Sequence, residues 1–96
     1  MDKTFYAVKL IPPRPDFAMT MTDDEKAVMG QHAAYWQQHM DKGFVHVFGP
    51  VMDPAGVYGF GIVSAEREEQ VKEFISNDPS MEFNRVEYYP MMATIK

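Results

Sequence analysis

The stretch GFVHVFGPVMDPAGVYGFGIV, from Gly43 to Val63, decides the fold because two apolar runs flank a loop rich in glycine and proline. The runs cover residues 44–48 and 57–63, and their aromatic and β-branched side chains pack well on a pleated sheet. With Gly/Pro clusters between them, they predict the two strands of a β-hairpin. Both strands carry apolar side chains on both faces; for example, Val45 and Val47 are expected on one face, opposite the two phenylalanines. Such a sheet needs a cover on each side.

The rest of the chain predicts two helices and two further strands. We expect a strand over Thr4–Leu10, a helix over Asp23–Asp41, a second helix over Ser64–Asn77 and a last, edge strand over Phe83–Met91. The order β-α-β-β-α-β is that of the ferredoxin-like α+β fold, in which both helices cover one face of a four-stranded antiparallel sheet. The 96 residues predict a single domain over 1–96. Because the other sheet face stays uncovered, we expect a second copy of the chain to cover it, which predicts a homodimer.

The segment between the first strand and the first helix is rich in proline. The run Ile11-Pro12-Pro13-Arg14-Pro15 excludes regular hydrogen bonding, because each proline lacks an amide donor and restricts the residue before it. We expect an extended loop as far as Met21, long enough to act as a lid or rim over a cleft. The helix then begins at the capping box of Thr22 and Glu25 and ends before Lys42-Gly43.

The composition excludes several classes of function. The net charge is −5 and no basic stripe is present to neutralise phosphates, so we expect no nucleic-acid partner. The chain has no cysteine, which rules out disulfides and thiol chemistry. No apolar run approaches the ~18 residues of a membrane helix, and the first residues, MDKTFYAVKL, lack the apolar core of a signal peptide. These features predict a cytoplasmic protein without a membrane partner.

Three histidines, His32, His39 and His46, raise the question of a metal site. His32 and His39 are seven residues apart, which separates their backbones by about 10 Å along a helix. Direct ligation of one metal by both rings requires metal–nitrogen distances near ~2 Å, which this spacing does not offer. The third histidine lies on a different element, and no zinc-binding motif is present. We therefore predict neither a metal nor another cofactor.

His32 is the histidine best placed for chemistry. It borders the helix face that is expected to pack on the sheet, one turn from Trp36, so it is expected to line a cleft with an aromatic wall. An imidazole there is suited to proton transfer near neutral pH. The alternative is a half-buried structural histidine that bonds a backbone carbonyl.

Two aspartates are candidate partners of His32. Asp53 opens the turn Asp53-Pro54-Ala55-Gly56, where an aspartate commonly bonds its own backbone. Asp78 precedes Pro79 and ends the second helix, but it also continues the inward face of that helix. Because turn chemistry already accounts for Asp53, we prefer Asp78 as the partner.

A series of short motifs follows in order from Met21 to Pro79. They are Met21-Thr22-x-x-Glu25, His32-Ala33-x-Tyr35-Trp36, Gly43, Phe48-Gly49-Pro50-Val51-x-Asp53-Pro54-x-Gly56, Tyr58-Gly59 and Asp78-Pro79. This order resembles that of the YCII-related (YciI-like) proteins over nearly the whole chain. The resemblance implies a dimeric α+β barrel of ferredoxin-like subunits, with an active site made of a histidine, by match His32, and an aspartate, by match Asp78 or Asp53. It also implies similarity to a few dehydrochlorinases and isomerase-type enzymes that act on small ring compounds.

Two functions fit these features. In the first, the protein is a lyase or isomerase in which His32 moves a proton on an acidic or cyclic small molecule and a carboxylate orients the ring. In the second, it is a non-catalytic module that binds a metabolite in the same cleft, and the fold alone does not decide between them. The side chains expected to hold the small-molecule ligand are Arg14, which would pair with an anionic group, and the aromatic Trp36, Tyr58 and Tyr6.

Overall fold

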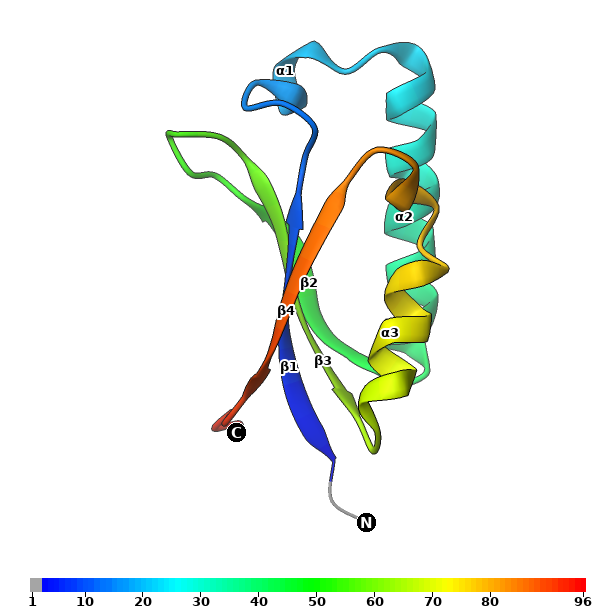
Figure 1. Cartoon of the computed structure of the whole chain (residues 1–96), viewed down its shortest axis with the longest axis vertical. Helices are drawn as coiled ribbons and strands as arrows, with labels where there is room; N and C mark the ends of the chain where they lie inside the picture. Colours follow the sequence, from blue (N-terminus) through cyan, green and yellow to red (C-terminus); the bar gives the residue numbers. More distant parts are fainter. Residues whose placement is uncertain (1–2) are drawn as a thin grey trace.

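The computed structural model describes residues 3–96, and its main elements follow the predicted order (Figure 1). They are β1 (Thr4–Ile11), α1 (Phe17–Thr20), α2 (Asp23–Asp41), β2 (Val45–Val51), β3 (Tyr58–Ala65), α3 (Glu68–Ser76), the 3-10 helix η1 (Pro79–Glu82) and β4 (Arg85–Met91). The four strands form one antiparallel sheet with the order β2-β3-β1-β4, which places β4 at an edge as predicted. The α+β, ferredoxin-like fold is therefore confirmed. Residues 1 and 2 of the predicted single domain lie outside the described residues.

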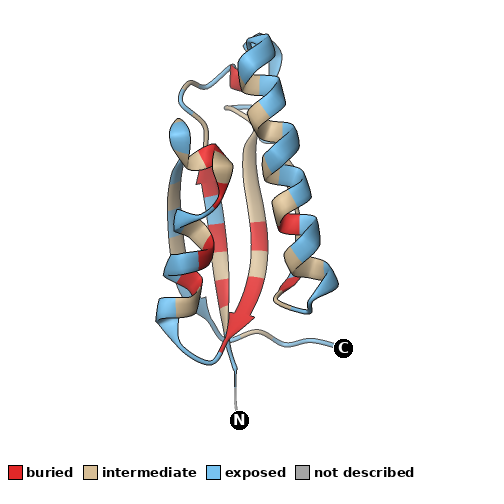
Figure 2. Cartoon of the chain, turned by 90° about the vertical axis from the view of Figure 1, so that its right-hand side faces the viewer, coloured by how far each residue is buried: buried red, intermediate tan, exposed pale blue. Residues whose placement is uncertain are grey.

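The helices α2 and α3 lie side by side over one face of the sheet, and the core lies between them and the strands (Figures 1 and 2). Every second residue of β1 points into this layer, as expected for a strand with one face on the core. The buried residues of the core cluster are Tyr6, Val8, Trp36, Val45, Val63, Ala65, Val71 and Phe74.

Helix α2 has the bounds that its end signals predict. The Thr22 hydroxyl accepts a hydrogen bond from the Glu25 amide at 3.1 Å, and the Glu25 carboxylate accepts one from the Thr22 amide at 2.9 Å. This reciprocal capping box pairs two amides that would otherwise lack partners at the helix start. At the other end, Gly43 has a φ of 85°, a left-handed value that glycine adopts without strain and that stops the helix.

The segment expected to be extended throughout 12–21 contains the short helix α1, so that prediction was wrong for its second half. The prolines constrain only residues 11–15. Beyond them the chain turns, because the Phe17 amide donates to the Arg14 carbonyl at 3.1 Å and the Met19 amide donates to the Asp16 carbonyl at 2.9 Å.

The second helix begins at Glu68 rather than at Ser64, which is a second correction. Ser64 and Ala65 extend β3 instead, where they pair with Phe5 and Thr4 of β1. This pairing joins residues about sixty positions apart in the chain, so no local pattern around Ser64 signals it.

The predicted alternation of Val45 and Val47 on one face was also wrong. Val45 pairs with Val63 and Val47 pairs with Ile62, so His46 is an extra residue in a β-bulge. As a result Val45 is 2% exposed and packs in the core, whereas Val47 is 52% exposed. The bulge shifts the pleat by one residue, and Phe48 faces the helices as Val45 does.

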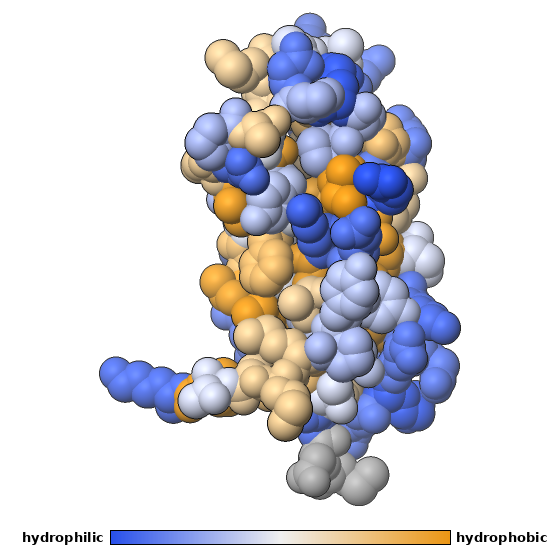
Figure 3. Space-filling model, turned by 60° about the vertical axis from the view of Figure 1, so that its left-hand side comes forward, coloured by the Kyte–Doolittle hydropathy of each residue, from blue (hydrophilic) through white to orange (hydrophobic). Residues whose placement is uncertain are grey.

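The sheet face away from the helices remains partly apolar. Its residues on β1, including Phe5 and Ala7, alternate with the core residues, and exposed apolar side chains such as Val47 and Tyr89 lie on the two edge strands, β2 and β4. Figure 3, which brings this side of the molecule forward, shows apolar side chains gathered beside hydrophilic ones. Within residues 3–96, no helix is both long and apolar enough to cross a membrane.

Candidate active site

Two elements bring the site together. His32 and Trp36 are one turn apart on α2, so their side chains project from the same helix face. Asp78 stands between α3 and η1, where the following Pro79 ends the first helix and starts the second. Because α3 packs beside α2, this junction faces the middle of α2.

The Asp78 carboxylate accepts three hydrogen bonds. Its Oδ2 lies 2.7 Å from His32 Nδ1 and 2.7 Å from Trp36 Nε1, and its Oδ1 accepts the Ser80 amide at 2.8 Å. The whole residue is only 4% exposed. The preference for Asp78 over Asp53 as the partner of His32 is confirmed by this geometry.

These bonds determine the charge of Asp78 and the tautomer of His32. Burial alone would raise the pKa of Asp78, but the hydrogen bonds from His32, the Ser80 amide and Trp36, with the charge of His32, outweigh burial and hold this pKa below its usual value. An ionised carboxylate only accepts hydrogen bonds, so His32 Nδ1 must carry the proton. In the neutral ring, Nε2 is then the free acceptor.

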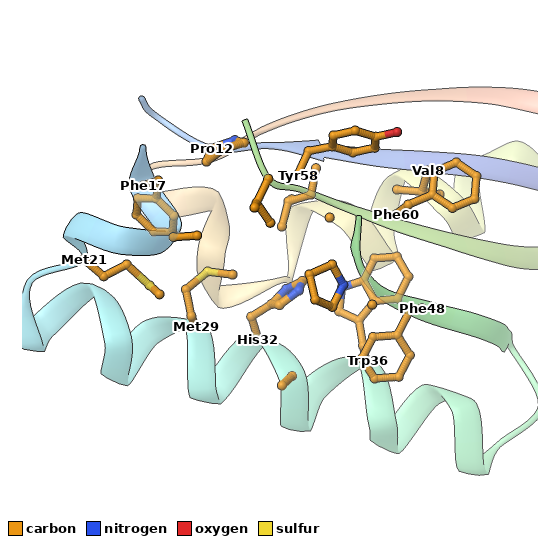
Figure 4. Close-up of a pocket in the computed structure, with 17 residues that line it drawn as sticks. Val8, Pro12, Phe17, Met21, Met29, His32, Trp36, Phe48, Tyr58 and Phe60 are labelled. Carbon is orange, nitrogen blue, oxygen red and sulfur yellow. The ribbon is translucent and has the colours of Figure 1, made fainter. Parts of the chain in front are cut away.

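The imidazole of His32 faces a cavity of about 260 Å³ between α2, the 12–21 segment and the hairpin (Figure 4). Within residues 3–96, no hydrogen bond reaches its Nε2. Most of the cavity wall is apolar or aromatic. The lining residues are Val8, Leu10, Pro12, Phe17, Ala18, Met21, Met29, His32, Ala33, Trp36, Phe48, Gly49, Pro50, Val57, Tyr58, Gly59 and Phe60. Four of these belong to the 12–21 segment, which forms a rim of the cavity as predicted.

Gly61 allows Trp36 to reach its position. A Cβ atom at Gly61 would lie 2.5 Å from Trp36 Cζ3, a distance that real side chains do not adopt. Without that atom, the indole lies directly against β3, with Phe48 and Phe74 on either side at centroid distances of 5.7 and 4.8 Å. The small residue on the strand therefore determines where the indole N–H meets Asp78.

Asp53 lies in the exposed hairpin turn. Its Oδ1 accepts the Ala55 amide at 2.9 Å, and its carbonyl accepts the Gly56 amide at 2.9 Å. This is the local turn chemistry that the sequence predicts. The structure does not bring Asp53 to His32.

Arg14 is occupied by other partners. Its guanidinium forms a bidentate ion pair with Glu25 at 2.8 and 3.0 Å and also donates to the hydroxyl and the carbonyl of Thr20 at 2.8 and 2.7 Å. The hydrogen bond from Arg14 lowers the pKa of Glu25 to about 2. Arg14 does not line the cavity, and it ties the 12–21 segment to the start of α2.

The three aromatic residues proposed as ligand walls lie in different surroundings. Trp36 lines the cavity next to His32, with a ring-centroid distance of 5.8 Å. Tyr58 lines its far edge, but Figure 4 shows its ring on the side of β3 away from His32, and Lys9 Nζ lies 4.5 Å from its centroid. Tyr6 is buried in the core against Tyr88 and does not line the cavity.

The other two histidines have partners of their own. His39 Nδ1 lies 2.8 Å from the Tyr35 carbonyl, and His46 Nε2 lies 2.7 Å from Ser64 Oγ. In the described part of the chain, no group of three or more His, Cys, Asp or Glu side chains is arranged to hold a metal ion.

The sequence interpretation missed two members of the site. Ser80, fully buried, supplies the amide to Asp78 Oδ1, and the spacing Asp-Pro-Ser is a signal for this N-cap bond. Trp36 was expected as a wall, but its indole N–H also donates to Asp78. The signal was that a buried indole usually finds an acceptor.

A family model of the YCII-related domain matches residues 5–94. The chain belongs to the YCII-related family. No curated protein sequence matches this YCII-related chain. Among solved structures, the uncharacterized protein TM1266 from Thermotoga maritima is similar with a TM-score of 0.59 and 10% identity, over 94% of this chain and 99% of the other.

A second solved structure is the 5-chloro-2-hydroxyhydroquinone dehydrochlorinase TftG from Burkholderia phenoliruptrix AC1100, in complex with 2,5-dihydroxybenzoquinone. Its TM-score is 0.59 and its identity 22%, over 85% of this chain and 90% of the other. At these identities, both comparisons establish the shared fold.

Proposed function

We propose that this YCII-related protein is an enzyme of the lyase or isomerase type, in which His32 moves a proton on a small ring compound bound in the cavity. The observation that carries the proposal is the 2.7 Å contact between His32 Nδ1 and Asp78 Oδ2, in a histidine whose ring faces the cavity. A general base needs hydrogen-bond reach to the substrate and a second group that orients it.

Each residue has a defined part in the proposed step. His32 Nε2 takes a proton from the bound molecule, and Asp78 holds the ring in the required tautomer and stabilises the imidazolium that forms. The electron pair left on the molecule either re-forms a bond at another carbon, which gives isomerisation, or expels a leaving group such as chloride. His32 then returns its proton to the product or to water, so neither reaction needs an oxidant.

The size of the cavity supports a single ring as the bound molecule. An apolar protein cavity of about 150 Å³ is large enough to hold benzene, and the cavity beside His32 has about 260 Å³. The similar structure of the dehydrochlorinase, solved with a benzoquinone, supports a single six-membered ring as the bound molecule.

The test is chloride release from 5-chloro-2-hydroxyhydroquinone, followed beside proton–deuterium exchange of non-chlorinated hydroquinones in D₂O. We expect turnover by the parent protein and a loss of at least about a hundredfold in His32→Gln, which keeps a polar side chain of similar size. Binding of these compounds with no chloride release and no exchange would overturn the enzymatic proposal and favour the non-catalytic binding module.

We also propose that the active form is a homodimer, which buries the helix-free face of each sheet. The support is the apolar character of that face, which no helix within residues 3–96 covers, and the membership of the YCII-related family. An interface of at least about 1,000 Å² is expected for a stable pair. Sedimentation that finds only monomer at micromolar concentration would contradict the dimer.

A further inference from the structure

We infer that the cavity selects neutral molecules and rejects both anions and cations of the same shape. The inference deepens the proposed function, on which it rests, because it concerns the same cavity and narrows the class of substrate. It is carried by the charges that surround the cavity and by the hydrogen-bonding groups that remain available inside it.

No Asp, Glu, Lys or Arg side chain is among the seventeen residues that line the cavity. Arg14, which the sequence suggested as a partner for an anionic group, directs its guanidinium to Glu25 and Thr20 and lies outside the lining. Lys9 lies over the Tyr58 ring, which Figure 4 shows on the opposite side of β3 from His32. An anionic ligand would therefore lose its hydration without gaining an Arg or Lys counter-charge from the cavity wall.

The charged group in contact with His32 is negative. Asp78 is an ionised carboxylate directly behind His32, with 2.7 Å between its Oδ2 and Nδ1. An anion that accepts a hydrogen bond at the other ring nitrogen would require His32 to take up a second proton. The carboxylate of Asp78 directly behind the ring would then offset much of the attraction between that imidazolium and the anion.

A cation is disfavoured for a different reason. The strong side-chain acceptor that faces the cavity from α2 is His32 Nε2, because Asp78 is screened behind the imidazole and the indole. Aromatic walls such as Trp36 and Phe48 attract a cation weakly, but they do not replace the several hydrogen bonds that an ammonium group makes in water.

The ligand that remains is neutral, mostly apolar and equipped with one O–H or N–H that can donate to His32 Nε2. The Trp36 indole N–H is already used by Asp78, so it offers no second polar contact. The rest of the molecule would pack against aromatic rings and the soft thioethers of Met21 and Met29. This chemistry fits a phenol or an alcohol on a ring, and it excludes carboxylates and phosphates.

The experiment compares three probes of nearly equal shape, benzyl alcohol, benzoate and benzylamine, titrated at pH 7 and constant ionic strength. Binding is read from chemical-shift changes of the Trp36 indole N–H. We expect benzyl alcohol to bind at least about tenfold more tightly than either charged probe. Benzoate or benzylamine binding as tightly as benzyl alcohol, or an absence of binding by all three, would overturn the inference.

A matched pair of variants tests whether the missing charge is the cause. Ala33→Lys adds an ammonium group beside His32 at the cavity wall, while Ala34→Lys adds the same group next along α2, outside the lining. Both positions are exposed, and lysine is a good helix former. We expect Ala33→Lys to shift the ratio of benzoate to benzyl alcohol affinity at least about tenfold towards benzoate, and Ala34→Lys to leave the ratio unchanged. An unchanged ratio in both variants contradicts the inference.

These readouts separate the inference from the proposed function. If benzyl alcohol binds preferentially but neither chloride release nor proton exchange is detected, the selectivity for neutral molecules is supported and the enzymatic role is contradicted. If hydroquinones are turned over but benzoate binds as tightly as benzyl alcohol, the enzymatic role is supported and the selectivity for neutral molecules is contradicted.

Discussion

Asp53 and Asp78 each stand directly before a proline, and each closes the same local hydrogen bond. Asp53 Oδ1 accepts the amide of Ala55 at 2.9 Å, and Asp78 Oδ1 accepts the amide of Ser80 at 2.8 Å. The second carboxylate oxygen makes the difference, because Oδ2 of Asp78 accepts two further hydrogen bonds from α2, whereas Asp53 lies at an exposed hairpin tip.

In both turns, the local hydrogen bond determines the partner of one carboxylate oxygen, Oδ1, and leaves the partner of Oδ2 undetermined. An Asp-Pro pair orients one oxygen toward the chain that follows it. What the other oxygen meets depends on where the fold carries the turn. At the end of α3 the turn reaches the middle of α2, and at the tip of the hairpin it reaches solvent. A substitution at Asp78 can therefore be compared with the same substitution at Asp53, where the local turn bond is alike and the second oxygen lacks the contacts with α2.

The largest difference is expected in turnover. Asp78→Asn removes the negative charge that holds the His32 tautomer and stabilises the imidazolium, so the rate of proton transfer should fall by about 10²- to 10⁴-fold. Asp53→Asn should change the rate less than about twofold, since asparagine keeps the Asx-turn bond. Single-turnover proton exchange in D₂O measures both. Equal losses in the two variants would remove Asp78 from the proposed mechanism.

The next largest difference is expected in stability. Asp78→Ala leaves the Trp36 indole N–H and the His32 Nδ1–H without their acceptor in a nearly dry site. The free energy of unfolding should fall by about 2–4 kcal/mol. Asp53→Ala removes one hydrogen bond at the surface and should lower it by at most about 1 kcal/mol. Urea denaturation compares the two, and a similar loss in both would contradict the burial argument.

A smaller effect should follow from moving the indole without touching either aspartate. Gly61→Ala places a methyl group 2.5 Å from Trp36 Cζ3, so the ring must shift, and we expect the free energy of unfolding to fall by about 1–3 kcal/mol. Gly49→Ala is the matched control, because its added Cβ meets nothing within 4 Å. The Trp36 indole N–H resonance should move in Gly61→Ala and stay in place in Gly49→Ala. An unmoved resonance in both would show that Gly61 does not position the indole.

The fold was largely predictable because its strongest signals are local. The capping box at Thr22 and the glycine at 43 give α2 its observed bounds without reference to any other element. The bulge at His46 and the extension of β3 to Ala65 were not predictable, since both depend on pairing with distant strands. A strand register is determined by its partner, and one sequence does not show which residues of the partner lie opposite.

In the candidate site, the residues whose positions follow from local spacing were predictable, and those whose contacts depend on distant segments were not. The inward direction of Asp78 follows from its spacing behind Phe74 and Ile75, which is why it was preferred over Asp53. The role of Arg14 was not accessible, because its ion pair with Glu25 depends on how the chain turns through α1. The orientation of the Tyr58 ring likewise depends on which side of β3 faces the helices.

The last and smallest difference is expected in the pH dependence of stability. The pKa of Asp78 in the folded chain lies below its ordinary value of 3.8, so between the two values the unfolded chain binds more protons than the folded chain. The stability that Asp78 contributes is therefore complete above about pH 4–5 and is lost as the pH falls through the folded pKa. Glu25, whose pKa is about 2 because of its hydrogen bond from Arg14, also loses its contribution to stability in the same pH range.

The informative quantity is therefore the difference in the pH dependence of stability between the parent and a variant that lacks the Asp78 carboxylate. From pH 6 to pH 3, Asp78→Asn should lose less unfolding free energy than the parent. Parallel curves for the parent and Asp78→Asn would show that the donors around Asp78 do not favour its ionised form.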